Sequence, residues 1–224
     1  MGSGSILRFM ENEAQIVALS VMALVYALKL RWIFKKNLVK EITPAKGDPQ
    51  KGARLSLLSI AMPWTMESML KHPLRYFEFV IFHLGVTAAI AASFIIPYAP
   101  KLFTIESVMY LFQGITGFAF IAGAVRLIKR SIMPDLRLIS SMDDYFSLIV
   151  LDVWLLTAFF GIPNKDYTAL ISFFIMTAFF LIFVPFSKIS HYLYYPFARV
   201  YFGRHFGRRG VYPKVGEKNM EAAK

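Results

Sequence analysis

The sequence predicts an all-α integral membrane protein with five transmembrane helices, an N-terminus outside the membrane and a C-terminus in the cytoplasm. Three observations favour this class: 57% of the 224 residues are hydrophobic, only 17% are charged, and the apolar residues fall into five long blocks. A soluble domain is about a quarter charged. Because lipid cannot satisfy backbone hydrogen-bonding groups, blocks of this length are expected to be helices.

Each apolar block is long enough to cross the bilayer core, which takes about 20 helical residues. Pro97 and Pro134 and the turn formed by Ile162, Pro163 and Asn164 predict where helices end. The five predicted spans cover residues 14–34, 76–97, 107–128, 145–162 and 168–195.

The basic residues predict the orientation. Of the 25 Lys and Arg, all but Arg8, Lys101 and Lys165 lie in three segments: residues 29–75 around the loop between spans one and two, residues 126–137 around the loop between spans three and four, and residues 188–224 at the end of the chain. By the positive-inside rule these segments are cytoplasmic. We therefore expect a multi-pass protein of the inner (cytoplasmic) membrane. Because the basic residues behind the formal net charge of +11 lie next to apolar spans, nucleic acid is not expected as a partner.

The chain divides into a five-helix membrane domain, residues 1–200, and a basic cytoplasmic tail, residues 201–224. The tail, rich in Gly, Arg and Lys, is expected to be irregular; it attracts anionic lipid or docks a cytoplasmic partner. The absence of cysteine excludes disulfides, iron–sulfur clusters and thiolate zinc sites in this chain.

Two histidines are the main candidates for chemistry. His83 lies about 10 Å along the second predicted span from its cytoplasmic start, and His191 lies near the cytoplasmic end of the fifth. Two neutral imidazoles at similar depth on different helices are the axial ligands that a b-type haem requires. The alternative for each is an interfacial histidine that only makes hydrogen bonds.

A glycine and two arginines near these histidines could either contact the haem or serve only helix packing and anchoring. Gly85, like the glycines of the third span, offers a flat surface for a macrocycle or for a neighbouring helix. Arg126 and Arg130, with Lys129 between them, are suited to pair with haem propionates or to anchor the helix at the cytoplasmic face.

The residues around both histidines resemble the gamma subunit of respiratory nitrate reductase, a membrane cytochrome b family. The string Pro185-Phe186-Ser187-Lys188, followed by His191, is similar to the end of that family's last span, and His83-Leu84-Gly85 is similar to its second-span motif. The resemblance covers residues 76–196 and implies that His83 and His191 bind the same haem. The size is similar to that of the cytochrome b subunits of sulfate-reducer complexes of the high-molecular-weight cytochrome c type.

The sequence departs from the two-haem members of that family. Where they carry the ligands of an outer haem, this chain has Ser93 and Phe173, neither of which ligates iron. The resemblance therefore implies one haem b. His72, next to Pro73, and His205, in the basic tail, are expected to be solvated or phosphate-contacting residues and not haem ligands.

We therefore expect a redox subunit that passes electrons between a quinone pool, with menaquinone as the candidate quinone, and partner iron–sulfur or cytochrome subunits, and that is not catalytic alone. The alternative is a cofactor-free membrane scaffold or transporter subunit. Two charged residues within the spans, Glu78 and Asp152, have no assigned role: Asp152 either serves a proton or quinone function or makes a buried hydrogen bond.

Overall fold

The computed structural model describes residues 3–36, 42–62 and 71–212, and these residues form helices and 3-10 turns without a strand. They belong to two compact units. Unit 1 comprises Met1–Ile33 and Glu78–Ile189, and unit 2 comprises Phe34–Phe77 and Ser190–Lys224. The all-α prediction is confirmed for the described residues.

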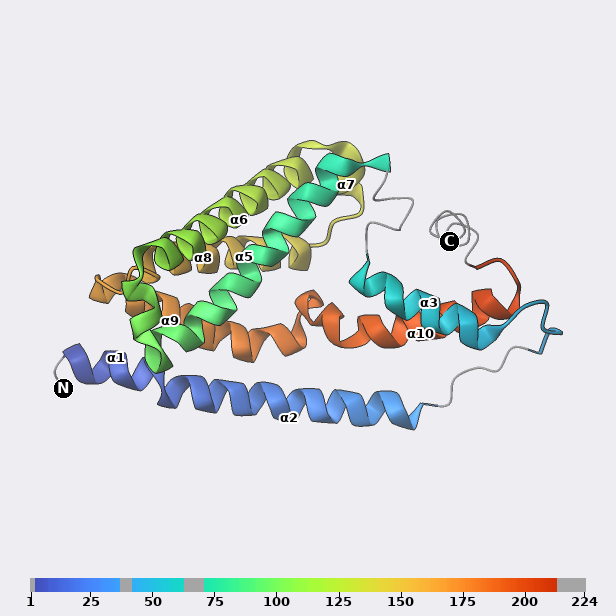
Figure 1. Cartoon of the computed structure of the whole chain (residues 1–224), viewed down its shortest axis with the longest axis horizontal. Helices are drawn as coiled ribbons and strands as arrows, with labels where there is room; N and C mark the ends of the chain where they lie inside the picture. The colour runs from blue at the N-terminus through green and yellow to red at the C-terminus, as the bar shows by residue number, and fades with distance from the viewer. Residues whose placement is uncertain (1–2, 37–41, 63–70, 213–224) are drawn as a thin grey trace. The chain divides into compact units, whose positions relative to one another are not determined.

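Within those residues, five helical segments are long and apolar enough to cross a membrane, as predicted. The chain is therefore a multi-pass membrane protein. The segments are Gly4–Lys35, Pro73–Tyr98, Glu106–Ile132, Met142–Gly161 and Tyr167–Phe186. The first is made of two helices, α1 (Ser3–Glu11) and α2 (Glu13–Lys35), and the next three are α5 (Pro73–Tyr98), α6 (Glu106–Ile132) and α8 (Met142–Gly161) (Figure 1).

The fifth predicted span was wrong at its end. Helix α9 (Tyr167–Phe183) stops before Pro185, which lies in the 3-10 turn η3 (Val184–Phe186). A second such turn, η4 (Lys188–Ser190), leads into a new helix, α10 (His191–Arg208). Proline lacks the N–H that would continue the helical hydrogen bonds, so the aromatic residues after it extend the apolar character of the sequence but not the span.

Unit 1 is a bundle in which α6 packs on α8, α8 on α9, and α1 on α9. The turn between α8 and α9 lies where the sequence predicted it, and Asn164 adopts a φ of 55° there. Short elements join the other helices: η2 (Pro100–Thr104) leads into α6, and α7 (Pro134–Leu138) follows it. The largest fully buried side chains include Phe173, Phe174, Leu155 and Ile162.

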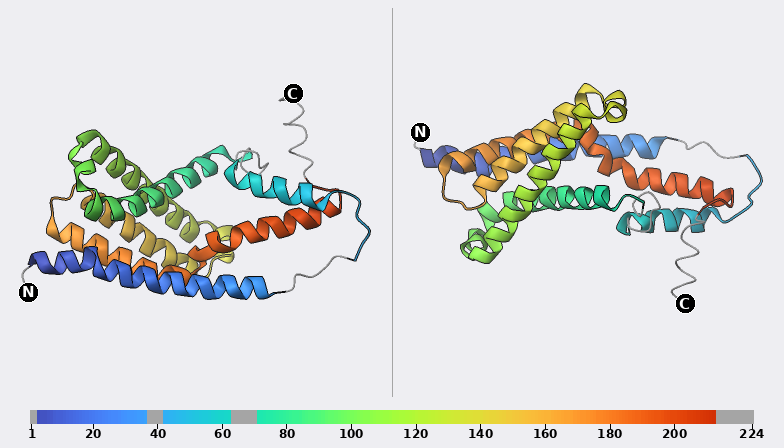
Figure 2. Two further views of the ribbon diagram at one scale, coloured as in Figure 1. Left: turned by 60° about the horizontal axis from the view of Figure 1, so that its bottom comes forward. Right: turned by 90° about the horizontal axis from the view of Figure 1, so that it is seen from above.

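Unit 2 contains a tight pair formed by α3 (Pro49–Ala61) and α10, which lie side by side in every view (Figure 2). The helices are antiparallel, because Gly47 faces Gly207 and Gly210 while Ser56 faces Gly203. The predicted irregular tail was wrong over its first part, since α10 continues to Arg208; residues 213–224 of that tail, and 63–70 of the long predicted loop, lie outside the described residues.

Candidate functional site

His83 lies on α5 with its side chain exposed on unit 1. Its Nδ1 is 2.8 Å from the carbonyl oxygen of Phe79, one turn earlier, and its ring lies 4.0 Å from the Phe79 ring between centroids. If Nδ1–H donates this bond, the lone pair stands on Nε2. Metal-binding histidines commonly use one ring nitrogen in this way, which orients the other toward the metal. This bond orients the His83 ring on α5.

The same local geometry occurs at His205 of α10. Its Nδ1 is 2.8 Å from the carbonyl oxygen of Tyr201, with a ring-centroid distance of 4.1 Å. The bond to the preceding turn is therefore a feature that helical histidines in this chain share, and it orients a ring without marking a ligand. His72 lies just before α5 and is exposed, and its carbonyl oxygen accepts a bond of 3.1 Å from the N–H of Tyr76 in the first turn of that helix.

His191 is the first residue of α10 and is exposed. The two 3-10 turns before it place it five residues beyond the last segment that could cross the membrane, Tyr167–Phe186. The sequence-based position of His191 inside the fifth span is thus corrected. His83 belongs to unit 1 and His191 to unit 2, so a shared iron stays a prediction.

Gly85 has a packing role in unit 1. A Cβ at this position would clash with the Cβ of Ala119 on α6 and would lie 3.1 Å from the carbonyl oxygen of Ile115. The surface of Gly85 is therefore covered by α6, as in close crossings of membrane helices. By contrast, a Cβ at Gly114 would meet nothing within 4 Å.

Arg126 joins a charged cluster between α5 and α6. Its Nε lies 3.8 Å from one carboxylate oxygen of Glu78, and Lys129 Nζ lies 2.6 Å from the other. The Arg126 guanidinium also stands 5.0 Å from the centroid of the Phe82 ring, a cation–π distance. Glu78, which had no assigned role, is therefore the carboxylate that holds two cations at this crossing.

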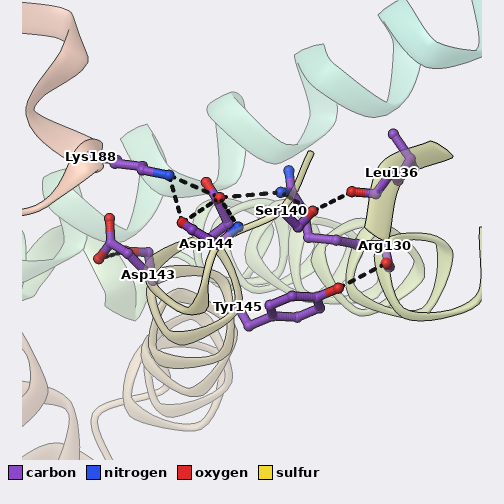
Figure 3. A network of polar contacts seen from close by, with 9 residues as sticks. Arg130, Leu136, Ser140, Asp143, Asp144, Tyr145 and Lys188 are labelled. Atoms are coloured by element: carbon purple, nitrogen blue, oxygen red, sulfur yellow. Dashed lines mark hydrogen bonds and ion pairs between the residues drawn. The ribbon is translucent and has the colours of Figure 1, made fainter. Parts of the chain in front are cut away.

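Arg130 belongs to a second polar network, at the start of α8 (Figure 3). Its Nη1 donates to Ser140 Oγ at 2.8 Å and lies 3.8 Å from Asp144 Oδ2. The same Asp144 oxygen accepts bonds of 2.8 Å from the Ser141 N–H and hydroxyl, and it pairs with Lys188 Nζ at 2.9 Å. This network ties the beginning of α8 to the turns after α9.

Asp152 lies halfway along α8 and is only 5% exposed. Its Oδ1 has no hydrogen-bond partner among the described residues. The carboxyl group rests against Gly123 of α6, where a Cβ would clash with it. Sequence analysis singled out Asp152 and, separately, the glycines of the third span, of which Gly123 is one. It did not pair the two residues, because their contact depends on how α6 and α8 cross.

The described residues contain no group of three or more His, Asp or Glu side chains arranged to hold a metal ion. An open pocket of about 320 Å³ lies between α8 and the start of α9, lined in part by Thr157, Asp166 and Ser172. None of the predicted site residues lines it. A bis-histidine haem needs only two side chains, so His83 and His191 remain its candidates in this chain.

Comparison with known proteins gave no match to a family model, to a curated protein or to a solved structure.

Proposed function

We propose that this chain is a membrane cytochrome b subunit of a respiratory complex in the inner (cytoplasmic) membrane, with one haem b between His83 and His191. The observation that carries the proposal is the position of the His83 imidazole, which is exposed on a helix apolar enough to span the membrane. The string from Pro185 to His191 adds support through its resemblance to the nitrate reductase gamma subunits.

In this proposal the two histidines hold the cofactor and the apolar helices set its surroundings. When bound, a b-type haem supplies one-electron transfer, here between a quinone pool and partner iron–sulfur or cytochrome subunits. The bond to the Phe79 carbonyl oxygen requires the proton on Nδ1 of His83, which would leave the Nε2 lone pair to bind the iron. Arg126 and Arg130 already pair with Glu78 and Asp144, so a propionate contact by either requires exchanging a carboxylate partner.

A second candidate is a cofactor-free scaffold or transporter subunit. The packing of Gly85 on Ala119 and the ion pairs of Arg126 and Arg130 favour it, because these three residues have protein partners that explain them without a cofactor. The two proposals differ in one property. A haem b subunit has the absorption spectrum of a reduced b-type cytochrome after purification, and a scaffold has none.

The ligands are tested by alanine substitution in the full chain. His83→Ala and His191→Ala should each remove the haem spectrum while the protein still inserts, because insertion depends on the apolar spans. His205→Ala is the matched control, since His205 has the same bond to the preceding turn as His83. Haem retained in both His83→Ala and His191→Ala would contradict the proposal, and so would haem lost in His205→Ala or His72→Ala with His83→Ala normal.

The haem content tests the expected stoichiometry. Ser93 and Phe173 occupy the positions of the outer ligands, so extraction should yield one haem b per chain. Phe173 is fully buried, and the Ser93 hydroxyl donates to the Ile90 carbonyl oxygen at 2.7 Å. Two haems per chain would contradict this part of the proposal.

The proposed orientation puts the N-terminus outside and the C-terminus in the cytoplasm. A reporter enzyme fused after Lys224 should be active in the cytoplasm, because the basic loops and the basic tail are retained on that side. A periplasmic signal from this fusion would reverse the topology and remove the cytoplasmic placement of the haem.

A further inference from the structure

The carboxyl group of Asp152 is enclosed by three helices of unit 1. Asp152 lies ten residues into α8, about 15 Å from its start at 1.5 Å per residue. Besides Gly123 on α6, the site is closed by the Phe82 ring of α5, whose edge would lie 3.0 Å from a Cβ at Gly123. The carboxyl group thus takes the space that a side chain at position 123 would occupy.

This enclosure limits what can bind Asp152 Oδ1. A quinone ring or a hydrated cation needs a cavity, whereas the carboxyl group fits against the backbone of α6 and beside Phe82. An ionised carboxylate with an unpartnered oxygen would be costly here, because neither lipid nor an apolar bundle solvates charge. A proton removes this charge and needs no space beyond that of the carboxyl group itself.

Charged groups reach Asp152 from one end of the site. Arg126 follows Gly123 by three residues, almost one turn of α6, and Glu78 of α5 lies beyond it. Of the next two cations on α6, Lys129 pairs with Glu78, and Arg130 is engaged with Ser140 and Asp144. Helix α9, which packs on the other side of α8, carries no charged side chain. Arg126 is therefore the cation placed to respond to the charge of Asp152.

The ion pair between Arg126 and Glu78 is long. Its Nε is 3.8 Å from Glu78, whereas Lys129 Nζ approaches the same carboxylate to 2.6 Å. Lys129 alone can therefore neutralise Glu78 if Arg126 turns away. Because the arginine side chain is long and its guanidinium lies over the Phe82 ring, rotation of that side chain can exchange Glu78 for Asp152 while the helices stay in place.

We propose that Asp152 is a proton-binding site inside the bundle, with Arg126 as the cation that replaces the proton. In the loaded state Asp152 carries the proton on its carboxyl group and Arg126 rests between Phe82 and Glu78. When the carboxyl O–H bond breaks, the proton leaves to water at the end of the bundle where Lys129 lies, and Arg126 pairs with the resulting carboxylate. Lys129 keeps Glu78 neutralised in both states.

Infrared spectroscopy of the purified full chain tests this site without any redox reaction. A protonated carboxyl group has a C=O stretch that a carboxylate lacks. In the unsubstituted protein we expect one such band from a buried carboxyl group, which disappears as the pH is raised. Asp152→Asn should remove the band. Glu106→Gln is the matched control, because Glu106 is an exposed carboxylate at the start of α6, and its substitution should leave the band unchanged.

Two further variants keep Asp152 and test its coupling to Arg126. Arg126→Gln removes the replacing cation, so the band should persist to a pH higher by at least about one unit. Glu78→Gln releases Arg126 toward Asp152, so the band should disappear at a lower pH than in the unsubstituted protein. These shifts are opposite in sign, whereas general loosening of the bundle would move both variants the same way.

Each outcome decides the proposal. A band that remains in Asp152→Asn shows that the proton is elsewhere, and an Arg126→Gln protein that titrates like the unsubstituted one shows that Arg126 is not its partner; either result overturns the site. The site does not depend on haem. A protein without haem but with this titration removes the proposed function alone, and a haem protein without it removes only the proton site.

Discussion

The two units of this chain pack their helices with different kinds of residue. Unit 1 buries large side chains, among them Phe173, Phe174 and Leu155, between α8 and its neighbours. In unit 2 every residue buried on α3 or α10 is small: Gly52, Ala53, Ser56 and Ser59 on α3, and Gly203 and Gly207 on α10. Unit 1 is thus filled by side chains, whereas the pair in unit 2 approaches backbone to backbone.

The charges differ in the same way. In unit 1 the carboxylates Glu78 and Asp144 each hold two cations within 4 Å. Among the described residues of unit 2, Asp48 is the single acidic side chain, and it caps α3 by accepting from the N–H groups of Gln50 and Lys51. Two arginines of unit 2 donate to backbone carbonyl oxygens: Arg208 to Thr43, and Arg199 to Ser56.

The chain thus pairs its helices in two ways, through large buried side chains in unit 1 and through small residues in unit 2. Apolar burial gives little advantage against lipid, so the spans of unit 1 need close packing of large side chains. Helices α3 and α10 are not among the segments apolar enough to cross a membrane, and they pack through small residues instead. Cβ atoms added in unit 2 should be far more damaging than Cβ atoms added on exposed faces, and side-chain truncation should be more damaging in unit 1. The four predictions below test this difference, from the largest expected effect to the smallest.

The largest effect is expected from Gly52→Leu in unit 2. A Cβ at position 52 would clash with the Gly203 carbonyl oxygen and would lie 2.6 Å from the Gly207 Cα, so only movement of the backbone can admit a side chain. We expect a loss of about 3 kcal/mol or more in the stability of the pair. Hydrogen exchange of peptides from α3 and α10 measures it, with Gly4→Leu, in open space, as the control.

Unit 1 should respond most to truncation of Phe173. This ring is fully buried, lies 6.3 Å from the Trp154 ring between centroids and contacts Gly161 at the end of α8. Phe173→Ala leaves a cavity at the contact of α8 and α9, and we expect a loss of about 2–3 kcal/mol in the free energy of unfolding by denaturing detergent. Phe160→Ala, on an exposed side chain of α8, should change it much less.

Gly85 and Gly114 form a matched pair within unit 1. Gly85→Ala forces the Cβ against Ala119 and should cost about 1–2 kcal/mol, whereas Gly114→Ala meets open space and should stabilise α6 by up to about 1 kcal/mol through helix propensity. Thermal unfolding followed by circular dichroism compares the two. Equal effects would mean that the α5–α6 crossing does not depend on the absence of a side chain.

Much of the fold could be predicted because long apolar runs and prolines are local signals. The second span was predicted at residues 76–97 and lies at Pro73–Tyr98, and the fourth was predicted at 145–162 and lies at Met142–Gly161. The C-terminal end of the fifth span was not predicted correctly, because aromatic residues continue in the sequence past Pro185. Helix α10 was missed because Gly203 and Gly207 disfavour a helix locally, and only contact with α3 explains them.

The features of the candidate site that are local in sequence could be predicted, and those that depend on helix crossings could not. Sequence placed His83 on an apolar helix, and the structure agrees, because the position of one residue within a long span is a local property. The contacts of Asp152 with Gly123 and of Arg126 with Glu78 depend on the crossings of α5, α6 and α8, which residue spacing along the chain does not encode. For Glu78 and Asp152, the sequence showed only that a charged residue lies within a predicted span, which marks a residue of interest but not its partners.

The smallest effect is expected from Lys188, the exposed member of the network around Asp144. Its side chain is 58% exposed, and its ammonium lies 2.9 Å from Asp144 Oδ2, an oxygen that also accepts from Ser141 and faces Arg130. Lys188→Met leaves those partners in place, so the free energy of unfolding should fall by less than about 1 kcal/mol.

Asp144→Ala, by contrast, removes the cap of α8 together with both ion pairs, and about 1–2 kcal/mol should be lost. A double-mutant cycle between Lys188→Met and Asp144→Ala should return a coupling of about 0.2–1 kcal/mol that decreases as salt is added, because exposed charges are screened. A coupling of several kcal/mol, independent of salt, would place this pair in a medium of low dielectric constant. The ion pairs of unit 1 would then act as buried pairs, unlike the arginine–carbonyl bonds of unit 2, although Lys188 is exposed.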